Sequence, residues 1–491
     1  MKSESEETFD VVVIGAGGAG FAAAIEARAG GAHVLLLEKN AKPGGSTSWS
    51  IGSITATGTP HQRAQGIVDS PADHWADMPG FAGDLAERDN EELRRILCDE
   101  IPATFQWLLD SGVRFMGPMP EPPHRQPRMH NVLPNSRSFI YHLSRRARRA
   151  GVVLRTSVQV DELLERAGRV VGVQCTVAGR SVVYEAARGV ILAAGDFTNS
   201  PELKARFMGE QEAKVDAVNT TATGDGQRMA ERLGARITNG DLALGPELRF
   251  IAPVKETLVR RLPPWRCLAA FMQWSMAHMP PTILRPFLMK FLTTALAPSP
   301  ALFDAGAVLV NQRGERFCDE QDRPASALPD QPGKVGWIVF DQVLAKRFSA
   351  WPYFVSTAPG VAYAYVPDYR HNRKDIYAES RSPEGLAEIL GMDKIALSRS
   401  LESLSSVSGP EAPRFVALGP VRSVFVHSEG GLRVDLSHRV LHSNGSVIPG
   451  LYAAGSTGQG GLLLKGHGHH LAWAFVSGRR AGRIAAFDSE S

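Results

Sequence analysis

The stretch Asp10–Gly20, DVVVIGAGGAG, constrains the fold of this 491-residue chain more than any other. Four consecutive β-forming residues, Val11 to Ile14, predict a buried parallel strand, and a glycine turn of the pattern GxGxxG follows at once. The first glycine makes the tight turn, the second lets the backbone approach a pyrophosphate, and the third lets the next helix pack closely on the strand. The stretch therefore predicts a strand–turn–helix unit whose helix N-terminus binds a diphosphate.

The second strand of this unit, HVLLLEKN, ends in Glu38, about 20 residues after the turn. A carboxylate at this point can hold a ribose hydroxyl, so the unit predicts a dinucleotide site that either NAD or FAD could fill. The residues expected to contact the dinucleotide here are Gly15, Gly17, Gly18, Ala19, Gly20, Glu38 and Lys39.

Composition excludes several classes of protein. The length favours two or three domains, and a formal net charge of +3 without a basic tail gives no sign of a nucleic-acid partner. The polar start MKSESEETF is not a secretory signal, and no apolar run reaches the roughly 18 residues of a membrane span. The four cysteines have no CxxC or metal-ligand spacing, so we expect reduced thiols, no metal site and a cytoplasmic protein, although four cysteines could also form disulfides; they are Cys98, Cys175, Cys267 and Cys318.

The next segment, Lys42–Thr59 (KPGGSTSWSIGSITATGT), is expected to be a loop that lies against a polar ring system. GAGGAG, the acidic strand end and PGGST together resemble the fumarate reductase/succinate dehydrogenase flavoprotein family, which includes urocanate reductase and the 3-ketosteroid dehydrogenases. In covalent members a histidine in this loop carries the flavin. This chain has Ser46, Thr47, Ser48 and Trp49 there, so the resemblance implies non-covalent FAD.

Other segments match the family's cofactor motifs. RGVILAAGDF ends a strand at Ala193-Ala194-Gly195 and departs from the family pattern at Asp196; the segment from Thr223 to Gly226 resembles a GDG motif, and PGLYAAG closes the site. A C-terminal helix from Leu471 would point its N-terminus at the flavin. The resemblance adds these cofactor-binding candidates: Gly44, Gly45, Ser46, Thr47, Val158, Ala194, Gly195, Gly224, Asp225, Gly455 and Leu471.

We expect an α/β fold with a Rossmann-type FAD-binding domain that is discontinuous in sequence, formed by residues 1–240 and 416–491. An α+β capping or substrate domain, residues 241–415, would be inserted between its halves. Within it, Ala307–Glu320 is expected to form a hairpin. The site should lie where the isoalloxazine meets the cap.

Two basic segments have more than one interpretation. Gly117–Arg137 is a proline-rich loop whose charged residues fit either an active-site entrance, as in the family, or a solvated loop; they are His124, Arg125, Arg128 and His130. Residues 255–290 combine six basic residues and one acid with aromatic and methionine side chains. That segment fits amphipathic capping helices, a lid over an apolar substrate, or a peripheral membrane contact.

The candidate catalytic groups follow from the resemblance and from the stretch KGHGHH near the C-terminus. His467 would take a proton, while Lys465 and the Gly468 amide would polarise a substrate carbonyl. His427, in HSEGG, resembles a substrate-facing histidine of the family. Arg323 lies one residue short of the family's proton-transfer position, so it is a weaker candidate.

These parts predict an FAD-dependent oxidoreductase that acts on a CH–CH bond next to a carbonyl. The first hypothesis is a dehydrogenase of a cyclic ketone or steroid-like substrate. The alternative is a reductase of an α,β-unsaturated carboxylate, with Arg323 as proton donor and with Lys465 and His427 binding the carboxylate. A third hypothesis is a membrane-docked flavoprotein subunit. Since the chain has no CxxCH haem motif, a diffusible or protein acceptor would take the electrons.

Overall fold

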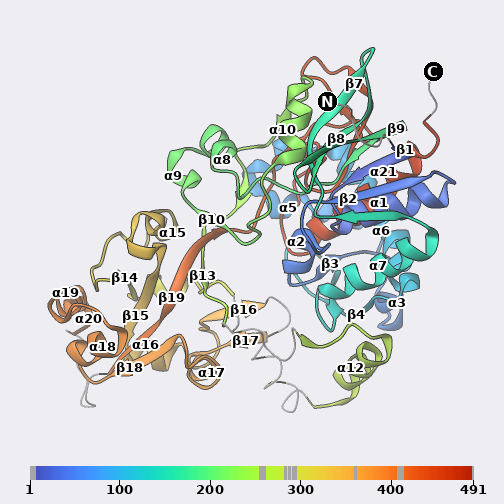
Figure 1. The fold of residues 1–491 in the computed structure, drawn as a ribbon. Helices are drawn as coiled ribbons and strands as arrows, with labels where there is room; N and C mark the ends of the chain where they lie inside the picture. Colours follow the sequence, from blue (N-terminus) through green and yellow to red (C-terminus); the bar gives the residue numbers. More distant parts are fainter. Residues whose placement is uncertain are drawn as a thin grey trace.

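The computed structural model describes residues 7–253, 261–280, 296–358, 362–405 and 414–488, together with Arg285, Met289 and Thr293. Two sheets organise these residues (Figure 1). The first holds the glycine turn, and the second is built mainly from the middle of the chain. Within the described residues, no helix is both long and apolar enough to span a bilayer.

The first sheet has eight strands, of which six follow the order β22-β23-β9-β1-β2-β6. Its centre is parallel: β1 pairs with β2, β9 pairs with β1, and β23 pairs with β9. The antiparallel strands β7 and β8 join through β9. The strands are β1 (Glu7–Ile14), β2 (Val34–Glu38), β6 (Val153–Thr156), β7 (Gln159–Arg166), β8 (Arg169–Val177), β9 (Arg180–Leu192), β22 (Arg439–Leu441) and β23 (Val447–Ala453). The half from the C-terminus therefore completes the sheet begun at the N-terminus.

The apolar run Val11–Ile14 is buried, as expected for a central strand of a parallel sheet. α1 (Gly18–Ala29) packs along α21 (His469–Ala485), and the close approach needs small residues. A Cβ on Gly478 or Gly482 would lie 2.3 Å and 2.1 Å from backbone oxygens of α1. Other helices of this half are α2 (Gly45–Trp49), α3 (Pro60–Ala64), α4 (Pro71–Asp77), α5 (Pro79–Ala82), α6 (Glu91–Ser111), α7 (Arg137–Ala150), α8 (Pro201–Met208), α9 (Glu210–Ala213) and α10 (Asp225–Arg232).

The second sheet has six strands around the long strand β19 (Phe415–Phe425), with its own apolar cores on its two faces. Its other strands are β10 (Asp216–Ala217), β13 (Glu247–Phe250), β14 (Val308–Asn311), β15 (Gly336–Asp341) and β18 (Tyr377–Ser380). The helices of this part are α14 (Ala301–Asp304), α15 (Pro324–Ala327), α16 (Gln342–Arg347), α17 (Val366–Asn372), α18 (Pro383–Leu390), α19 (Lys394–Ser400) and α20 (Glu402–Ser405). The α/β class is confirmed. The domain boundaries at 240 and 416 stay a prediction. In the structure, β10, which precedes residue 240, pairs with β19, which begins at Phe415, so the second sheet includes a strand from before the first boundary.

Short sheets complete the fold. β3 (Ser53–Thr55), β5 (Met129–Leu133) and β4 (Arg114–Met119) form a three-stranded sheet beside α6 and α7. The pairs are β11 (Ile237–Thr238) with β21 (Gly431–Leu432), β12 (Ala243–Leu244) with β20 (His427–Ser428), and β16 (Ser356–Ala358) with β17 (Ala362–Ala364). α12 (Arg266–His278) packs on β4 and β5 (Figure 1).

Three local predictions were wrong. Lys42–Thr59 is not a continuous loop, because it contains α2 and β3. Gly117–Arg137 contains β5, whose side chains are buried between β3 and β4. Ala307–Glu320 makes a single bridge, Val310 to Arg316, since β14 pairs instead with β15.

Candidate functional site

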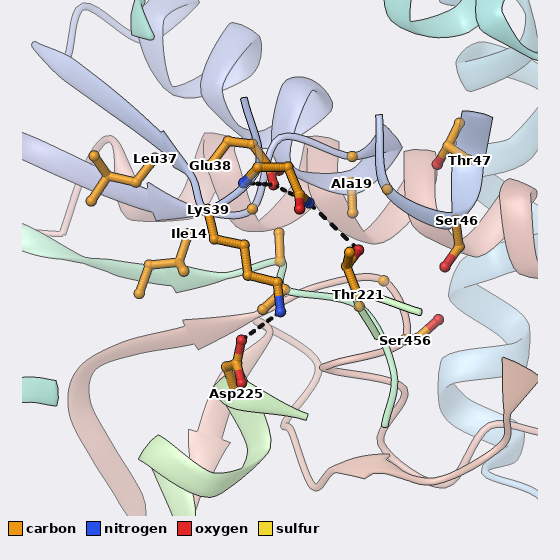
Figure 2. Close-up of a pocket in the computed structure, with 18 of the residues that line it drawn as sticks. Ile14, Ala19, Leu37, Glu38, Lys39, Ser46, Thr47, Thr221, Asp225 and Ser456 are labelled. Carbon is orange, nitrogen blue, oxygen red and sulfur yellow. Dashed lines mark hydrogen bonds and ion pairs between the residues drawn. The ribbon is translucent and has the colours of Figure 1, made fainter. Parts of the chain in front are cut away.

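A pocket open to solvent lies at the carboxyl ends of β1, β2 and β9 (Figure 2). Its space free of protein atoms, open solvent included, is about 860 Å³. The predicted residues that line the pocket are Gly15, Gly17, Gly18, Ala19, Glu38, Lys39, Gly45, Ser46, Thr47, Val158, Ala194, Gly195, Asp225 and Gly455. The pocket thus gathers residues that are separated by more than 400 positions in the chain.

The three glycines of the turn differ in the space around them. Gly15 has φ = 101°, and a Cβ on it would lie 2.4 Å from the Ala193 carbonyl oxygen. A Cβ on Gly20 would lie 1.7 Å from the Gly15 oxygen, so this glycine is required by packing. A Cβ on Gly17 would meet nothing nearer than 3.8 Å, which leaves its backbone open to the pocket. The turn therefore offers a ligand an uncovered backbone at Gly17, directly before the N-terminus of α1.

Glu38 lies at the end of β2 and is buried. One carboxylate oxygen accepts from the Ala16 amide at 2.9 Å, and the other accepts from the Asn40 amide at 2.9 Å and from Asn40 Nδ2 at 2.8 Å. These bonds fix the carboxylate beside the glycine turn, where Figure 2 shows it at the pocket wall. This is the position that a ribose-binding acid needs.

Lys39 lies across the pocket from α10. Its Nζ donates to Asp225 at 2.8 Å and to Thr223 Oγ1 at 2.6 Å (Figure 2). Burial alone would raise the pKa of Asp225, but the hydrogen bond and charge of Lys39 outweigh burial and lower it. The ion pair joins β2 to the GDG segment at one side of the pocket.

The loop after β2 faces the same turn. Thr47 Oγ1 accepts from the Gly18 amide at 3.1 Å, and Asn219 donates to Ser46 Oγ at 2.9 Å. A Cβ on Gly195 would stand in open space, which again leaves backbone uncovered at the pocket wall. Backbone amides, small hydroxyl side chains and a fixed carboxylate fit the diphosphate and ribose of FAD.

Four predicted cofactor residues lie outside the pocket lining. Gly20 and Gly44 support the turn and the loop, Gly224 precedes α10 with φ = 74°, and Leu471 packs within α21. Conversely, sequence reasoning missed several polar lining residues: Asn40, Asn219, Thr221 and Ser456. Asn40 directly follows the predicted Lys39, and Ser456 directly follows the PGLYAAG motif, so neighbouring residues could have indicated both. Asn219 and Thr221 lie in an irregular segment that contains no motif pointing to them.

Glu429 is the centre of a second group of side chains, which sequence reasoning missed. Its carboxylate is fully buried, and Oε1 lies 3.5 Å from His470 Nε2, 3.8 Å from Lys465 Nζ and 4.0 Å from His427 Nε2. Oε2 accepts from Gln459 Nε2 at 2.6 Å and from the Leu464 amide at 3.1 Å. Two of the predicted catalytic residues, Lys465 and His427, therefore share one buried anion.

The electrostatics of this group follow from burial. Burial would raise the pKa of Glu429, but its interaction with His470 and the hydrogen bond that it accepts from the Leu464 amide hold that pKa well below its ordinary value. Burial and the neighbouring His470 lower the pKa of His427 far below 6.5. At neutral pH Glu429 is therefore a carboxylate and His427 is a neutral imidazole.

His467 has a different partner. Its Nδ1 lies 2.5 Å from Oε1 of the buried Glu121, and the same oxygen accepts from the His467 amide at 2.9 Å. Thr55 Oγ1 donates to the His467 carbonyl at 2.5 Å. Half of the His467 side chain is exposed (46%), so the ring is oriented from behind and accessible in front. The Gly468 amide, next in the chain, contacts no acceptor among the described residues.

Arg323 lies elsewhere. It is exposed, precedes α15 with φ = 50°, and belongs to the second-sheet part of the molecule (Figure 1). The structure does not bring its side chain into contact with Lys465, His467 or His427.

Most of the charged and histidine side chains in the loop between β4 and β5 and at the start of β5 are buried, although their charge predicted exposure to solvent. Arg128 is fully buried and pairs with Asp69 and Asp77, both at 2.6 Å. His124 and His130 are also buried, while Arg125 is exposed. The interpretation of these residues as a solvated loop is therefore wrong for all except Arg125.

With this geometry in place, comparison with known proteins identifies the family. The FAD binding domain family matches residues 10–250 and 271–463. The chain belongs to this family. It is an FAD-binding oxidoreductase of the group that acts on CH–CH or C=C bonds. Non-covalent binding stays a prediction.

Two relatives of this flavoprotein illustrate the range. A probable fumarate reductase, Ifc3, of Shewanella frigidimarina (strain NCIMB 400) is 28% identical over 98% of this chain and 75% of its own length. A vinyl phenol reductase of Lactiplantibacillus plantarum (strain ATCC BAA-793 / NCIMB 8826 / WCFS1) is 26% identical over 99% of this chain and 98% of its own length. The predicted resemblance to fumarate reductase flavoproteins is confirmed.

Solved structures show the same fold. A flavocytochrome c3 fumarate reductase in its open conformation superposes on this flavoprotein with a TM-score of 0.73 at 24% identity, over 98% of this chain and 79% of that one. The 3-ketosteroid-Δ4-(5α)-dehydrogenase of Rhodococcus jostii RHA1 gives a TM-score of 0.61 at 24% identity, over 99% and 98% of the two chains.

Proposed function

We propose that this flavoprotein desaturates a CH–CH bond next to the carbonyl of an uncharged cyclic ketone or steroid-like substrate. Bound FAD would supply the hydride acceptor. The residues that would hold it are those around the pocket at the glycine turn. The chain itself has to bind the carbonyl, orient the substrate and take the proton from the carbon next to the carbonyl.

The observation that carries this proposal is the pair formed by Glu121 and His467. A carboxylate at 2.5 Å from Nδ1 fixes the ring orientation and stabilises the imidazolium that forms when Nε2 takes a proton. Because the ring is half exposed, Nε2 is free to approach a substrate. The amide of Gly468 and the Lys465 ammonium would donate to the carbonyl oxygen and acidify the adjacent carbon.

Glu429 supports an uncharged substrate. Its buried negative charge faces Lys465 and His427, the two groups that would otherwise bind a carboxylate. A second carboxylate placed there would meet an anion of the same sign in a low-dielectric site. The vinyl phenol reductase matches nearly the whole of this chain, and the substrate in its name, a vinyl phenol, has no carboxylate.

A second candidate is the reverse reaction on an α,β-unsaturated carboxylate. The names of relatives such as Ifc3 favour it. In that case Arg323 would donate the proton, with Lys465 and His427 as carboxylate ligands. The exposed position of Arg323 on the second-sheet part is the feature that favours the first proposal.

A membrane contact by residues 255–290 is also retained as a proposal. Residues 255–260, 281–284, 286–288 and 290 of this segment lie outside the described residues. In the described part, α12 has two aromatic side chains of high exposure, Phe271 (61%) and Trp274 (55%), beside the exposed Trp265. Co-sedimentation with anionic vesicles should fall for a Phe271→Ser/Trp274→Ser double variant, and equal sedimentation would contradict the contact.

The experiment that tests the main proposal follows flavin reduction by stopped flow under anaerobic conditions. His467→Ala should retain FAD and slow reduction by a ketone substrate about 100-fold or more, the usual size of a general-base contribution. Arg323→Ala is the matched variant, and it should reduce at nearly the wild-type rate. A strong effect of Arg323→Ala with none of His467→Ala would replace the first proposal by the second.

A further inference from the structure

Three histidines from distant parts of the chain meet in the interior. His74 comes from α4, His124 from the loop before β5, and His469 from the first turn of α21. All three are buried, and one ring nitrogen from each lies within 4.8 Å of the others. His74 and His469 are 395 positions apart, so no sequence spacing indicated this group.

The distances within the group suit a metal ion. His74 Nε2 and His469 Nε2 are 3.3 Å apart. Bonds of about 2.0–2.1 Å in a tetrahedral zinc site place neighbouring ligand nitrogens about 3.3–3.4 Å apart. A ring nitrogen of His124 lies within 4.8 Å of the other two, so movements of the rings would complete the set.

Hydrogen bonds already orient the rings. His469 Nδ1 donates to the Lys465 carbonyl at 2.6 Å, which turns the lone pair of Nε2 toward His74. Such a bond from the other ring nitrogen to a carbonyl is the usual support of a metal-bound histidine. His124 Nδ1 accepts from Arg128 at 2.8 Å, so Nε2 carries the ring proton. That Nε2 has no partner among the described residues, and neither has His74 Nδ1.

A network of ion pairs lies behind His124. The charged residues behind His124 are Arg125, Arg128, Asp69, Asp73 and Asp77, with one net negative charge. Phe81 packs against His124 and His469 and closes one side of the group.

We propose that His74, His124 and His469 bind one divalent transition-metal ion, with zinc as the best match. Each histidine would bind the ion as a neutral imidazole through a ring nitrogen that carries no proton; at His124 the ring proton then moves from Nε2 to Nδ1, and the Arg128 Nη1 hydrogen bond to Nδ1 is given up. Because the ligands are buried, the ion is structural. It ties α4 and the loop that carries Glu121 to the turn that carries Lys465 and His467, and it thereby fixes the separation of the catalytic groups.

The test uses the FAD-loaded protein after dialysis against a chelator. Competition with a chromogenic chelator should show one equivalent of bound Zn²⁺, and Co²⁺ should give the visible absorption of a tetrahedral site. His74→Gln and His124→Gln should each lower Zn²⁺ affinity at least about 100-fold. His470→Gln is the matched control, since it alters the other group of possible ligands, His427, Glu429 and His470. It should bind Zn²⁺ as the wild type does.

Two results would overturn the proposal. One is a wild-type protein that binds no Zn²⁺ at concentrations of tens of micromolar. The other is a loss of binding in His470→Gln with binding retained in His74→Gln. The FAD absorbance of each variant reports whether it folds, and the wild-type titration decides the matter even if a variant does not. The outcome does not depend on which substrate the enzyme uses.

Discussion

Glu121 changes what His467 can do. The imidazole is otherwise on an exposed glycine-rich turn, and the buried carboxylate at 2.5 Å gives it one orientation. The contact joins residues 346 positions apart. A group that moves a proton needs such an orienting partner.

The first prediction concerns this pair. Glu121→Gln keeps an acceptor for the ring N–H but removes the charge that stabilises the imidazolium. Flavin reduction by a ketone should slow about 10- to 100-fold, while KM and FAD content stay near the wild-type values. An effect on KM alone would show that Glu121 acts on binding rather than on the proton transfer.

The second prediction concerns Glu429. Glu429→Gln removes the anion that Lys465 and His427 face, so carboxylate compounds should bind better relative to ketones. For a matched cyclohexenone and cyclohexenecarboxylate, the ratio of dissociation constants should shift toward the acid by about 10-fold or more, or about 1.4 kcal/mol. A ratio that does not change would mean that the substrate does not approach this group. Loss of a buried charge should also lower the melting temperature.

Among the elements, the strand–turn–helix unit of β1 and α1 can be predicted fully from sequence because its signals are local. The apolar run, the glycines and the acid at Glu38 act within 30 residues of each other. The short strand β5 was not predictable in this way. Its residues form a strand because they pair with β3 and β4 in the buried sheet, and no local sequence pattern indicates this pairing.

The third prediction separates packing from cofactor binding in this unit. Gly17→Ala meets no atom nearer than 3.8 Å, so the variant should fold normally. Its methyl group would stand where the diphosphate approaches the backbone, and FAD affinity should fall about 10-fold or more. Gly20→Ala, with a Cβ 1.7 Å from the Gly15 oxygen, should instead fail to fold. Equal FAD affinity in Gly17→Ala and the wild type would contradict the placement of the diphosphate.

At the scale of the whole molecule, buried neutral histidines couple the fold to pH. Burial lowers their pKa values from 6.5 to about 2 for His124, about 3 for His130 and His438, and about 4 for His469. Between those values and 6.5 the unfolded chain binds more protons than the folded chain. The free energy of unfolding therefore falls as the pH drops below about 6.5.

The fourth prediction follows with its sign. From pH 7 to pH 5, each of these histidines should cost about 2 kcal/mol of stability, measured by urea unfolding in the presence of a chelator. His438 contacts Trp473 and lies outside the proposed metal group, so His438→Gln is a suitable comparison. Its unfolding free energy should fall less steeply with acid than that of the wild type. Stability that is flat from pH 7 to pH 5 would mean that these rings are not buried as neutral groups.

The whole-molecule arrangement sets the limit of sequence prediction. Repeating patterns and motifs indicated the α/β class, FAD and the segments that line its pocket. The pairing of His467 with Glu121, the Glu429 group and the three buried histidines depend on which loops the fold brings together. Arg323 shows the converse: a residue near a family position in sequence lies on an exposed turn of the second-sheet part.

The most direct test of the central claim is an anaerobic spectral titration of the FAD-loaded protein with a matched panel of cyclic ketones and carboxylic acids. Ketones with a saturated CH–CH bond next to the carbonyl should bleach the flavin absorbance, and saturated dicarboxylates such as succinate should leave it unchanged. If no ketone bleaches the flavin while unsaturated carboxylates reoxidise the reduced flavin, the proposed desaturation of a ketone is contradicted.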